Sequence, residues 1–492
     1  SGGYLRGSPD GSKIAAVFCW SVNPIELYDF DNSTGVLSNA VLLNTGHDYY
    51  GIEFSPDGNI LYTSIEVGGQ IYRSVRTTQN LRPETYELLG ADYQHGQTLE
   101  NAFRKAGIEF LSGAAVWQVD PDRAVHFLRN GKSLQVGVRR LLVATGAMER
   151  PVPIPGWTLP GVMGAAAADV LLKSSGAVPS GRVVLSGSGP LLWLAASRLV
   201  EAEVEILAIL ETINFSSYLK ALPYLPQALR AVEYLLKGLR LKRQVSRAGI
   251  PVFSGIQNLR AEGTQRLETV CFTHRGQSRK FELETLLLHE GIVPNTQLTR
   301  QLGCEHSWNK LQRYWHPLLD EWGNTSVEGV AVAGDGGIVA GALTAEASGH
   351  LAALEIACQL GAITKNQRDS ASKSYRKAIR HHQAVRPFLE HLYPPNPETL
   401  VPPDDATLVC RCEEVSAAQI RQAVEWGALD LSQMKAFTRC GMGPCQGRMC
   451  ALTVAEIVAN AQGKSAQEVG FFRGRPPLKP ITLGQLAGIA EC

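Results

Sequence analysis

Four cysteines near the end of the chain have the type and spacing of metal ligands. Cys410 and Cys412 form a C-x-C pair, and Cys445 and Cys450 follow after 32 and then four intervening residues. Four thiolates are the ligand set of a 2Fe–2S or 4Fe–4S cluster, and structural zinc also accepts them. Zinc sites more often carry C-x-x-C pairs, which neither pair has, so the pattern favours iron–sulfur. Cys440, five residues before Cys445, is a spare thiol that could replace one of the four as a ligand.

A glycine-rich turn in the middle of the chain has the form of a nucleotide-binding loop. Gly187 and Gly189 follow the apolar run RVVLS and open a helix, whose N-terminal N–H groups favour a pyrophosphate. Glu211 ends the next strand, 24 residues after Gly187, where an acid binds ribose hydroxyls. We expect NAD(P) or another adenine nucleotide here. Leu192 replaces the third glycine of the fingerprint, so a structural β–α–β unit without a ligand stays open as an alternative.

Residues that suit a nucleotide also lie at the carboxyl ends of two further predicted strands. Thr145 and Gly146 end the strand RLLVATG, and Gly334 and Asp335 end the strand VAVAG. An acid at the mouth of a parallel sheet hydrogen-bonds ribityl or ribose hydroxyls. Each triplet alone is a common strand exit, but their order around the β–α–β unit is more specific.

Strands that alternate with helices from residue 78 onwards predict an α/β fold with a doubly wound, parallel core. After the β–α–β unit we expect a β-rich stretch and then a second buried strand, TLLLHEGIVPN. A proline-rich linker precedes the cysteine module. The predicted units are a β-propeller-like fragment (1–77), a first nucleotide-binding part (78–180), a second dinucleotide-binding domain (181–300), the return of the first part with a helical extension (301–392), the linker (393–405) and a small helical 2Fe–2S domain (406–492).

The N-terminal segment 1–77 differs from everything that follows it. SPDGSKIA at 8–15 recurs as SPDGNILY at 55–62, and each copy reads as a turn inside a hairpin. The period of 47 residues resembles one blade of a β-propeller, and a propeller closes only with about 4–8 blades. We therefore expect this β-rich appendage either to pack on the next domain or to belong to a fusion.

Composition excludes several classes of function. The 492 residues carry a formal charge of +1 and no charge block, so nothing indicates a nucleic-acid partner. No apolar run reaches the roughly 18–20 residues that span a bilayer, and the start of the chain does not read as a signal peptide. Half of the ten cysteines are clustered, which indicates a metal site in a reducing compartment, and we expect a cytoplasmic protein.

Several segments together resemble a known family, namely LLVATGAMERPVPIPGWTLPGVM, VVLSGSGPLL, LLLHEGIVPNTQLTR, VAVAGDG and CRCEEV with KAFTRCGMGPCQGRMC. They are similar to the flavoprotein oxidoreductases with two dinucleotide-binding domains. The resemblance is closest to the alpha subunits of opine oxidase and dye-linked L-proline dehydrogenase and to the B subunit of hydrogen cyanide synthase. It covers about 78–492, and its last part is similar to the bacterioferritin-associated ferredoxin type of 2Fe–2S domain.

The resemblance implies roles for the residues singled out above. Cys410, Cys412, Cys445 and Cys450 would be the cluster ligands, Gly187 and Gly189 would cradle the second nucleotide, and Gly334 with Asp335 would face FAD. It also implies a separate, flavin-dependent partner subunit that oxidises the C–N bond of an amino acid or opine.

One departure from the family concerns FAD. The family opens with a Gly-rich loop for the FAD pyrophosphate, whereas 1–77 carries the blade-like repeat in its place. Without those N–H donors the two phosphate charges lose their main partners, so we expect FAD binding by this chain to be weak or absent.

The sequence thus predicts an oxidoreductase subunit that relays electrons through flavin and a 2Fe–2S cluster to an acceptor. A non-catalytic nucleotide-binding scaffold that docks a flavoprotein partner is the alternative. His289, beside Glu290, is expected to be a hydrogen-bonded structural histidine. His381 and His382 are expected on a solvated helix face, because no cysteine or acid is spaced along the sequence to join them in a metal site.

Overall fold

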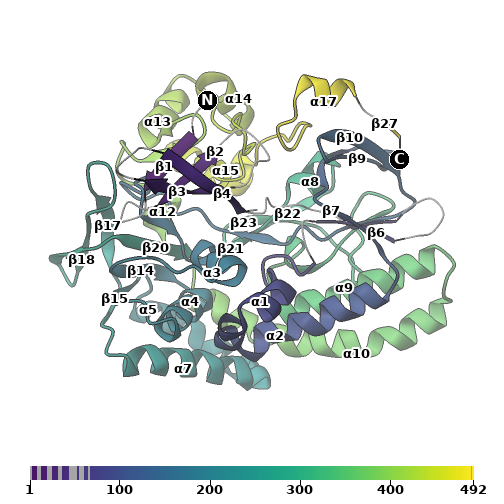
Figure 1. The fold of residues 1–492 in the computed structure, drawn as a ribbon, viewed down its shortest axis with the longest axis horizontal. Helices are drawn as coiled ribbons and strands as arrows, with labels where there is room; N and C mark the ends of the chain where they lie inside the picture. The colour runs from purple at the N-terminus through teal and green to yellow at the C-terminus, as the bar shows by residue number, and fades with distance from the viewer. Residues whose placement is uncertain are drawn as a thin grey trace.

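The computed structural model describes residues 67–488 and seven shorter strands at the two ends of the chain (Figure 1). Four of these strands form an antiparallel sheet in the order β1-β2-β3-β4, and a second antiparallel hairpin joins β5 to β6. The hairpins predicted around both SPDG turns are therefore present, although the turns themselves lie outside the described residues. The bounds are β1 Gly3–Gly7, β2 Lys13–Phe18, β3 Ile25–Asp31, β4 Val36–Leu43, β5 Ile52–Phe54, β6 Ile60–Ser64 and β27 Ala490–Glu491.

The first nucleotide-binding sheet has five strands in the order β24-β11-β5-β6-β7. The pairs β11–β24 and β6–β7 are parallel, whereas β5 is antiparallel to both of its neighbours, so the N-terminal hairpin lies inside this sheet. Helix α9 packs its Ala352 and Ile356 on Leu142 and Ala331 of the sheet. The bounds are α1 Val75–Leu81, α2 Pro83–Lys105, β7 Glu109–Ser112, β11 Leu141–Val143, β24 Val330–Val332, α9 Ala342–Gln359 and α10 Lys365–Gln383.

A smaller sheet, in the order β27-β10-β9-β8, is antiparallel from β8 to β10, whereas β27 pairs with β10 in parallel. Its predicted hairpin turns at Asn130 and Gly131, both with positive φ, as a two-residue hairpin turn requires. Here β8 is Ala115–Val119, β9 is Ala124–Arg129 and β10 is Lys132–Gly137. Two further ladders have two strands each. β12 Ala147–Glu149 pairs with β21 Ile292–Pro294, and β22 His306–Asn309 pairs with β23 Tyr314–Pro317. Helix α8 spans Gln297–Gln301.

The second nucleotide-binding sheet is fully parallel, in the order β13-β20-β14-β15-β16. Its continuous apolar strands are buried on both faces, as expected for such a sheet. The predicted β–α–β unit is β14–α4–β15. The bounds are β13 Val162–Gly164, α3 Ala165–Ser175, β14 Val183–Ser188, α4 Pro190–Glu201, β15 Ile206–Glu211, β16 Val252–Ser254 and β20 Thr285–Glu290.

The segment after β15 corrects the sequence analysis. We expected a β-rich stretch, but the chain first forms helices α5 Phe215–Ala221, α6 Leu225–Ala228 and α7 Val232–Arg247, joined by 3-10 turns. Only then does the antiparallel sheet β17 Gln257–Glu262, β18 Thr269–His274 and β19 Gln277–Glu282 follow. In Figure 1 helix α7 lies along the lower edge of the molecule.

The cysteine module is a helical unit with its own core. Ser416 and Gln419 form the predicted capping box at the start of α13, and Ile420, Met434 and Val454 from three helices share one buried cluster. The linker contains one short helix, α12. The bounds are α11 Arg386–Leu392, α12 Pro397–Leu400, β25 Leu408–Cys410, β26 Val415–Ser416, α13 Ala417–Glu425, α14 Leu431–Thr438, α15 Ala451–Gln462, α16 Ala466–Val469 and α17 Leu483–Ala487. Among the described residues, no helix is long and apolar enough to cross a membrane.

Candidate cofactor sites

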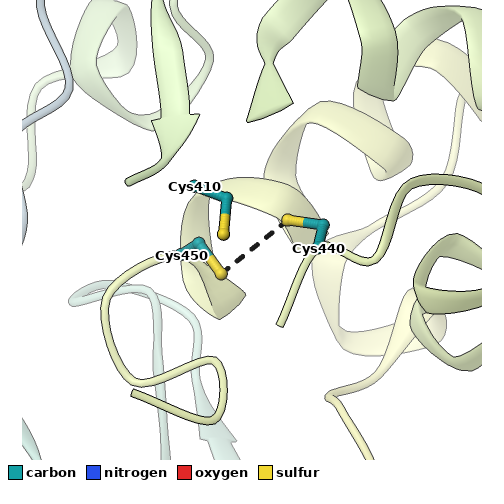
Figure 2. Close-up of side chains that lie close together, drawn as sticks. All are labelled: Cys410, Cys440 and Cys450. Carbon is teal, nitrogen blue, oxygen red and sulfur yellow. Dashed lines mark hydrogen bonds between the residues drawn. The ribbon is translucent and has the colours of Figure 1, made fainter. Parts of the chain in front are cut away.

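Three buried sulfur atoms from separate elements meet in the cysteine module. Cys410 ends β25, Cys440 follows α14 and Cys450 caps the N-terminus of α15. Their Sγ atoms all lie within 4.8 Å of one another, and those of Cys440 and Cys450 are 3.8 Å apart. Figure 2 shows the three side chains pointing at one another. The positive end of the α15 dipole favours negative charge at this place, which suits thiolates.

The other two cysteines form a second contact in the same module. The Cys412 thiol donates to the Cys445 sulfur, and this contact lowers the pKa of Cys445 to about 6. An added Cβ at Gly443 would lie 2.2 Å from the Cβ of Cys412, so glycine allows this close approach. Cys412 is exposed, whereas Cys410, Cys440 and Cys450 are buried.

The structure therefore brings all four predicted ligands into one module, but it groups them differently from the sequence prediction. Cys440, which we treated as a spare thiol, lies closest to Cys410 and Cys450, while Cys412 pairs with Cys445. Hydrogen bonds from the thiols of Cys440 and Cys450 hold the pKa of Cys410 well below its ordinary value. Backbone N–H groups also donate to the sulfurs, Gly441 to Cys410 and Gly447 to Cys445, which is typical of loops that hold clusters.

The second cysteine loop is docked against the first nucleotide-binding part. The Gln297 amide donates to the carbonyls of Cys445 and Gln446 at 3.3 and 3.2 Å, and Arg448 donates to Gln297 Oε1 at 3.1 Å. A small crevice between the two parts is lined by Thr145, Gln297 and Arg448. The second cysteine loop thus lies at the same boundary as Thr145, one of the residues predicted to bind a nucleotide.

The strand exits predicted to face FAD lie side by side. Val143 of β11 and Val332 of β24 are direct partners in a parallel pair, so Thr145 and Gly334 leave the same edge of the sheet. An added Cβ at Gly336 would lie 3.2 Å from Thr145 Oγ1. Asp335 is buried, and its Oδ1 accepts from the N–H groups of Ala340 and Gly341, just before α9; burial raises the pKa of this carboxyl.

The two glycines of the second loop have different structural roles. Both have positive φ, 134° at Gly187 and 107° at Gly189. An added Cβ at Gly187 would lie 1.7 Å from the carbonyl oxygen of His289, whereas at Gly189 it would meet nothing closer than the His289 ring at 3.7 Å. Gly187 is therefore required for strand packing, and Gly189 leaves space at the start of α4.

This difference gives a matched pair of variants. We expect Gly187→Ala to lower the free energy of unfolding by about 1–3 kcal/mol more than Gly189→Ala, because only the first adds a clash to the shared φ strain. The measurement is the denaturant midpoint of each variant without added nucleotide. Equal midpoints would contradict a packing role for Gly187.

Glu211, the acid predicted to bind ribose hydroxyls, has its carboxylate hydrogen-bonded in the protein interior. Its side chain accepts from Trp193 Nε1 at 3.1 Å and from Ser254 Oγ at 2.9 Å, and it pairs with Lys242 at 3.4 Å. The residue is 2% exposed. A ribose would reach this carboxylate only if the network opened.

A cavity of about 210 Å³ lies at the carboxyl ends of the second sheet. It is lined by Gly187, Glu290 and the linker residues Asn396 and Glu398. Burial raises the pKa of Glu290, which accepts from Thr212 Oγ1 at 2.8 Å. The cavity is smaller than the roughly 300–1,000 Å³ of most ligand pockets. This cavity therefore does not fit a whole dinucleotide, and nucleotide binding at Gly187 and Gly189 stays a prediction.

His289 is a buried structural histidine, as the sequence indicated. Its Nδ1 lies 2.6 Å from Glu149 Oε1, and the residue is 1% exposed.

Comparison with known proteins identifies an oxidoreductase of the dinucleotide-binding class, in agreement with the α/β fold. The family model for pyridine nucleotide-disulphide oxidoreductases matches residues 59–349, more than half of the chain, and the model for the sarcosine oxidase A3 domain matches 405–489. The chain belongs to the pyridine nucleotide-disulphide oxidoreductase family, on the branch that contains the A subunits of opine oxidases.

Two relatives illustrate this membership. The opine oxidase A subunit of Rhizobium meliloti is 41% identical over 85% of this chain and 80% of its own length. Hydrogen cyanide synthase subunit HcnB of Pseudomonas aeruginosa is 32% identical over 70% of this chain and 75% of its own. The crystal structure of L-proline dehydrogenase from P. horikoshii has the same fold, with a TM-score of 0.62 at 17% identity over 98% of this chain and 91% of that one. The chain is thus an oxidoreductase of the FAD/NAD(P)-binding class.

Proposed function

We propose that this chain is the electron-relaying subunit of a complex that oxidises a C–N bond of an amino acid or opine. The relatives are named as subunits of opine oxidase and hydrogen cyanide synthase, which supports a separate partner subunit. The observation that carries the relay is the convergence of the Cys410, Cys440 and Cys450 sulfurs in a module whose Cys445 loop is hydrogen-bonded to Gln297 of the predicted flavin-binding part. We place the complex in the cytoplasm, because free thiolates persist in a reducing compartment.

The residues of this chain would bind and tune the cofactors. Cys410, Cys412, Cys445 and Cys450 are the proposed ligands of a 2Fe–2S cluster, which passes single electrons when bound. Thr145 and Asp335, on one sheet edge, would contact flavin. Gln297 fixes the distance between that edge and the cysteine loop through its bonds to two loop carbonyls. The electron acceptor, such as a quinone, would be reached from the cluster.

The test is substrate-dependent dye reduction by the chain co-purified with its partner subunit. We expect the complex to reduce dye with an opine or amino acid, and the chain alone to reduce none, since the substrate chemistry belongs to the partner. A Cys445→Ser complex should keep substrate-dependent bleaching of flavin yet lose onward reduction of the acceptor. Full acceptor reduction by that variant would contradict the relay.

Flavin content is a separate prediction. We expect the chain alone to hold much less than one FAD, because 1–77 lacks the Gly-rich loop whose N–H groups would bind the pyrophosphate. The visible spectrum of the purified chain, calibrated by released flavin, measures this. A yellow protein with one FAD per chain would show that other groups supply the phosphate contacts.

The scaffold alternative rests on the second nucleotide site. The hydrogen bonds that hold Glu211 in the protein interior and the small acid-lined cavity both favour a domain with a structural role that binds no dinucleotide. A scaffold would support partner activity even when its cysteines are replaced. Acceptor reduction by the Cys445→Ser complex therefore distinguishes an electron relay from a scaffold.

A further inference from the structure

Two histidines and one carboxylate converge on the surface between α7 and α10. His381 Nε2 lies 2.6 Å from Glu233 Oε1, and one ligand atom from each of Glu233, His381 and His382 lies within 4.8 Å of the other two. No acid is spaced along the sequence to join these histidines in a metal site. The fold supplies one, because Glu233 is 148 residues away from His381 along the chain.

The second histidine is already oriented in the way that metal ligands usually are. Tyr234 Oη lies 2.9 Å from His382 Nδ1. In the tautomer in which Nδ1 donates to this oxygen, Nε2 is left as the ligand atom. Histidines that bind metals typically have their other ring nitrogen fixed in this manner.

The backbone beneath this cluster is well packed. Ala228 and Ala231, just before α7, form a buried apolar cluster with Ala384 and Val385, just after α10. The ligand-bearing ends of the two helices are therefore held together by packing, and little ordering remains to oppose ion binding.

We propose that Glu233, His381 and His382 form a binding site for a divalent first-row transition ion of the zinc class. Two imidazoles and one carboxylate suit this class, and three protein ligands leave a fourth position for water. The ion links α7 of the second nucleotide-binding domain to α10 of the helical extension. This site is separate from the cysteine module and independent of the proposed function.

The test is Co²⁺ titration of the full chain followed in the visible range, with Zn²⁺ competition. Thiolate-bound Co²⁺ gives strong sulfur-to-metal charge-transfer absorption, so the d–d bands of a nitrogen–oxygen site are distinguished from any binding by the cysteines. We expect Glu233→Gln, His381→Gln and His382→Gln each to weaken the nitrogen–oxygen component by roughly tenfold or more, within the range for damaged metal sites. His274→Gln, on β18, is the matched control and should titrate as the parent does.

Zn²⁺ anomalous scattering from soaked crystals gives a second readout that does not depend on variant stability. A peak between Glu233 and the two histidines is expected. Anomalous peaks at the cysteines alone, or an unchanged nitrogen–oxygen component in Glu233→Gln and His381→Gln, would overturn the proposal.

Discussion

Cys450→Ser is expected to cut the iron content of the purified chain by roughly tenfold or more. Cys450 is wholly buried at the N-terminus of α15, where its sulfur meets those of Cys410 and Cys440. Loss of a residue that merely supports a ligand already costs about 10–100-fold in metal affinity, so loss of a ligand costs at least as much. Serine preserves the size of the side chain, and iron and acid-labile sulfide are measured per chain.

Two serine variants serve as controls for this result. Cys358→Ser removes a thiol on α9, outside the module, and should leave iron unchanged. Cys440→Ser decides the ligand set, because this thiol contacts Cys450 but is not among the four proposed ligands. We expect its cluster to survive. Iron lost from Cys440→Ser and kept in Cys412→Ser would show that Cys440 replaces Cys412 as a ligand.

Glu456→Ala is expected to lower the free energy of unfolding by about 3 kcal/mol. Glu456, on α15, is 4% exposed and makes a two-pronged ion pair with Arg313, whose Nε lies 2.7 Å from Glu456 Oε1. Loss of one partner of a buried pair leaves the other charge uncompensated, which costs about 3–5 kcal/mol; Arg313 keeps some contact with solvent, which places the effect at the lower end. The measurement is chemical denaturation.

The same pair connects the cysteine module to the rest of the chain. Arg313 precedes β23, and its guanidinium also lies over the Trp308 ring, 5.7 Å from the centroid. Asp405→Ala is the matched control. It removes the carboxylate of the exposed Asp405–Arg421 pair and should cost about 1 kcal/mol or less. Equal losses in the two variants would contradict an anchoring role for Glu456.

The sequence predicted the structure best where residues close together along the chain determine the local fold. The β14–α4–β15 unit was predicted because its apolar runs and its glycine turn are contiguous. The hairpin at Asn130 and Gly131 was predicted from the dipeptide alone, since few residues tolerate the backbone that this turn needs. Ser416 and Gln419 likewise marked the start of α13, because a capping box is a local pattern.

The errors came from contacts between distant residues and from one local pattern that was overlooked. The helices after β15 were missed although Val232, Leu236 and Leu239 on α7 have the i, i+4, i+7 spacing of one helix face; these three side chains are exposed. No local pattern indicated that Glu233 would reach His381. Cys440 was left as an exchangeable fifth thiol, because spacing along the chain does not show which sulfurs meet.

The burial of Glu211 was equally invisible in the sequence. Its position at the end of β15 matches that of a ribose-binding acid, but three side chains from other elements satisfy the carboxylate. Whether such a residue faces a ligand depends on its neighbours in space, and the sequence does not reveal them.

The most direct test of the central claim is an iron and acid-labile sulfide analysis of the anaerobically purified chain, combined with electron paramagnetic resonance after reduction. A cluster held by the module predicts about two irons and two sulfides per chain and a signal from a reduced 2Fe–2S centre. Stoichiometric zinc without sulfide, or free thiols at all of these cysteines, would contradict it.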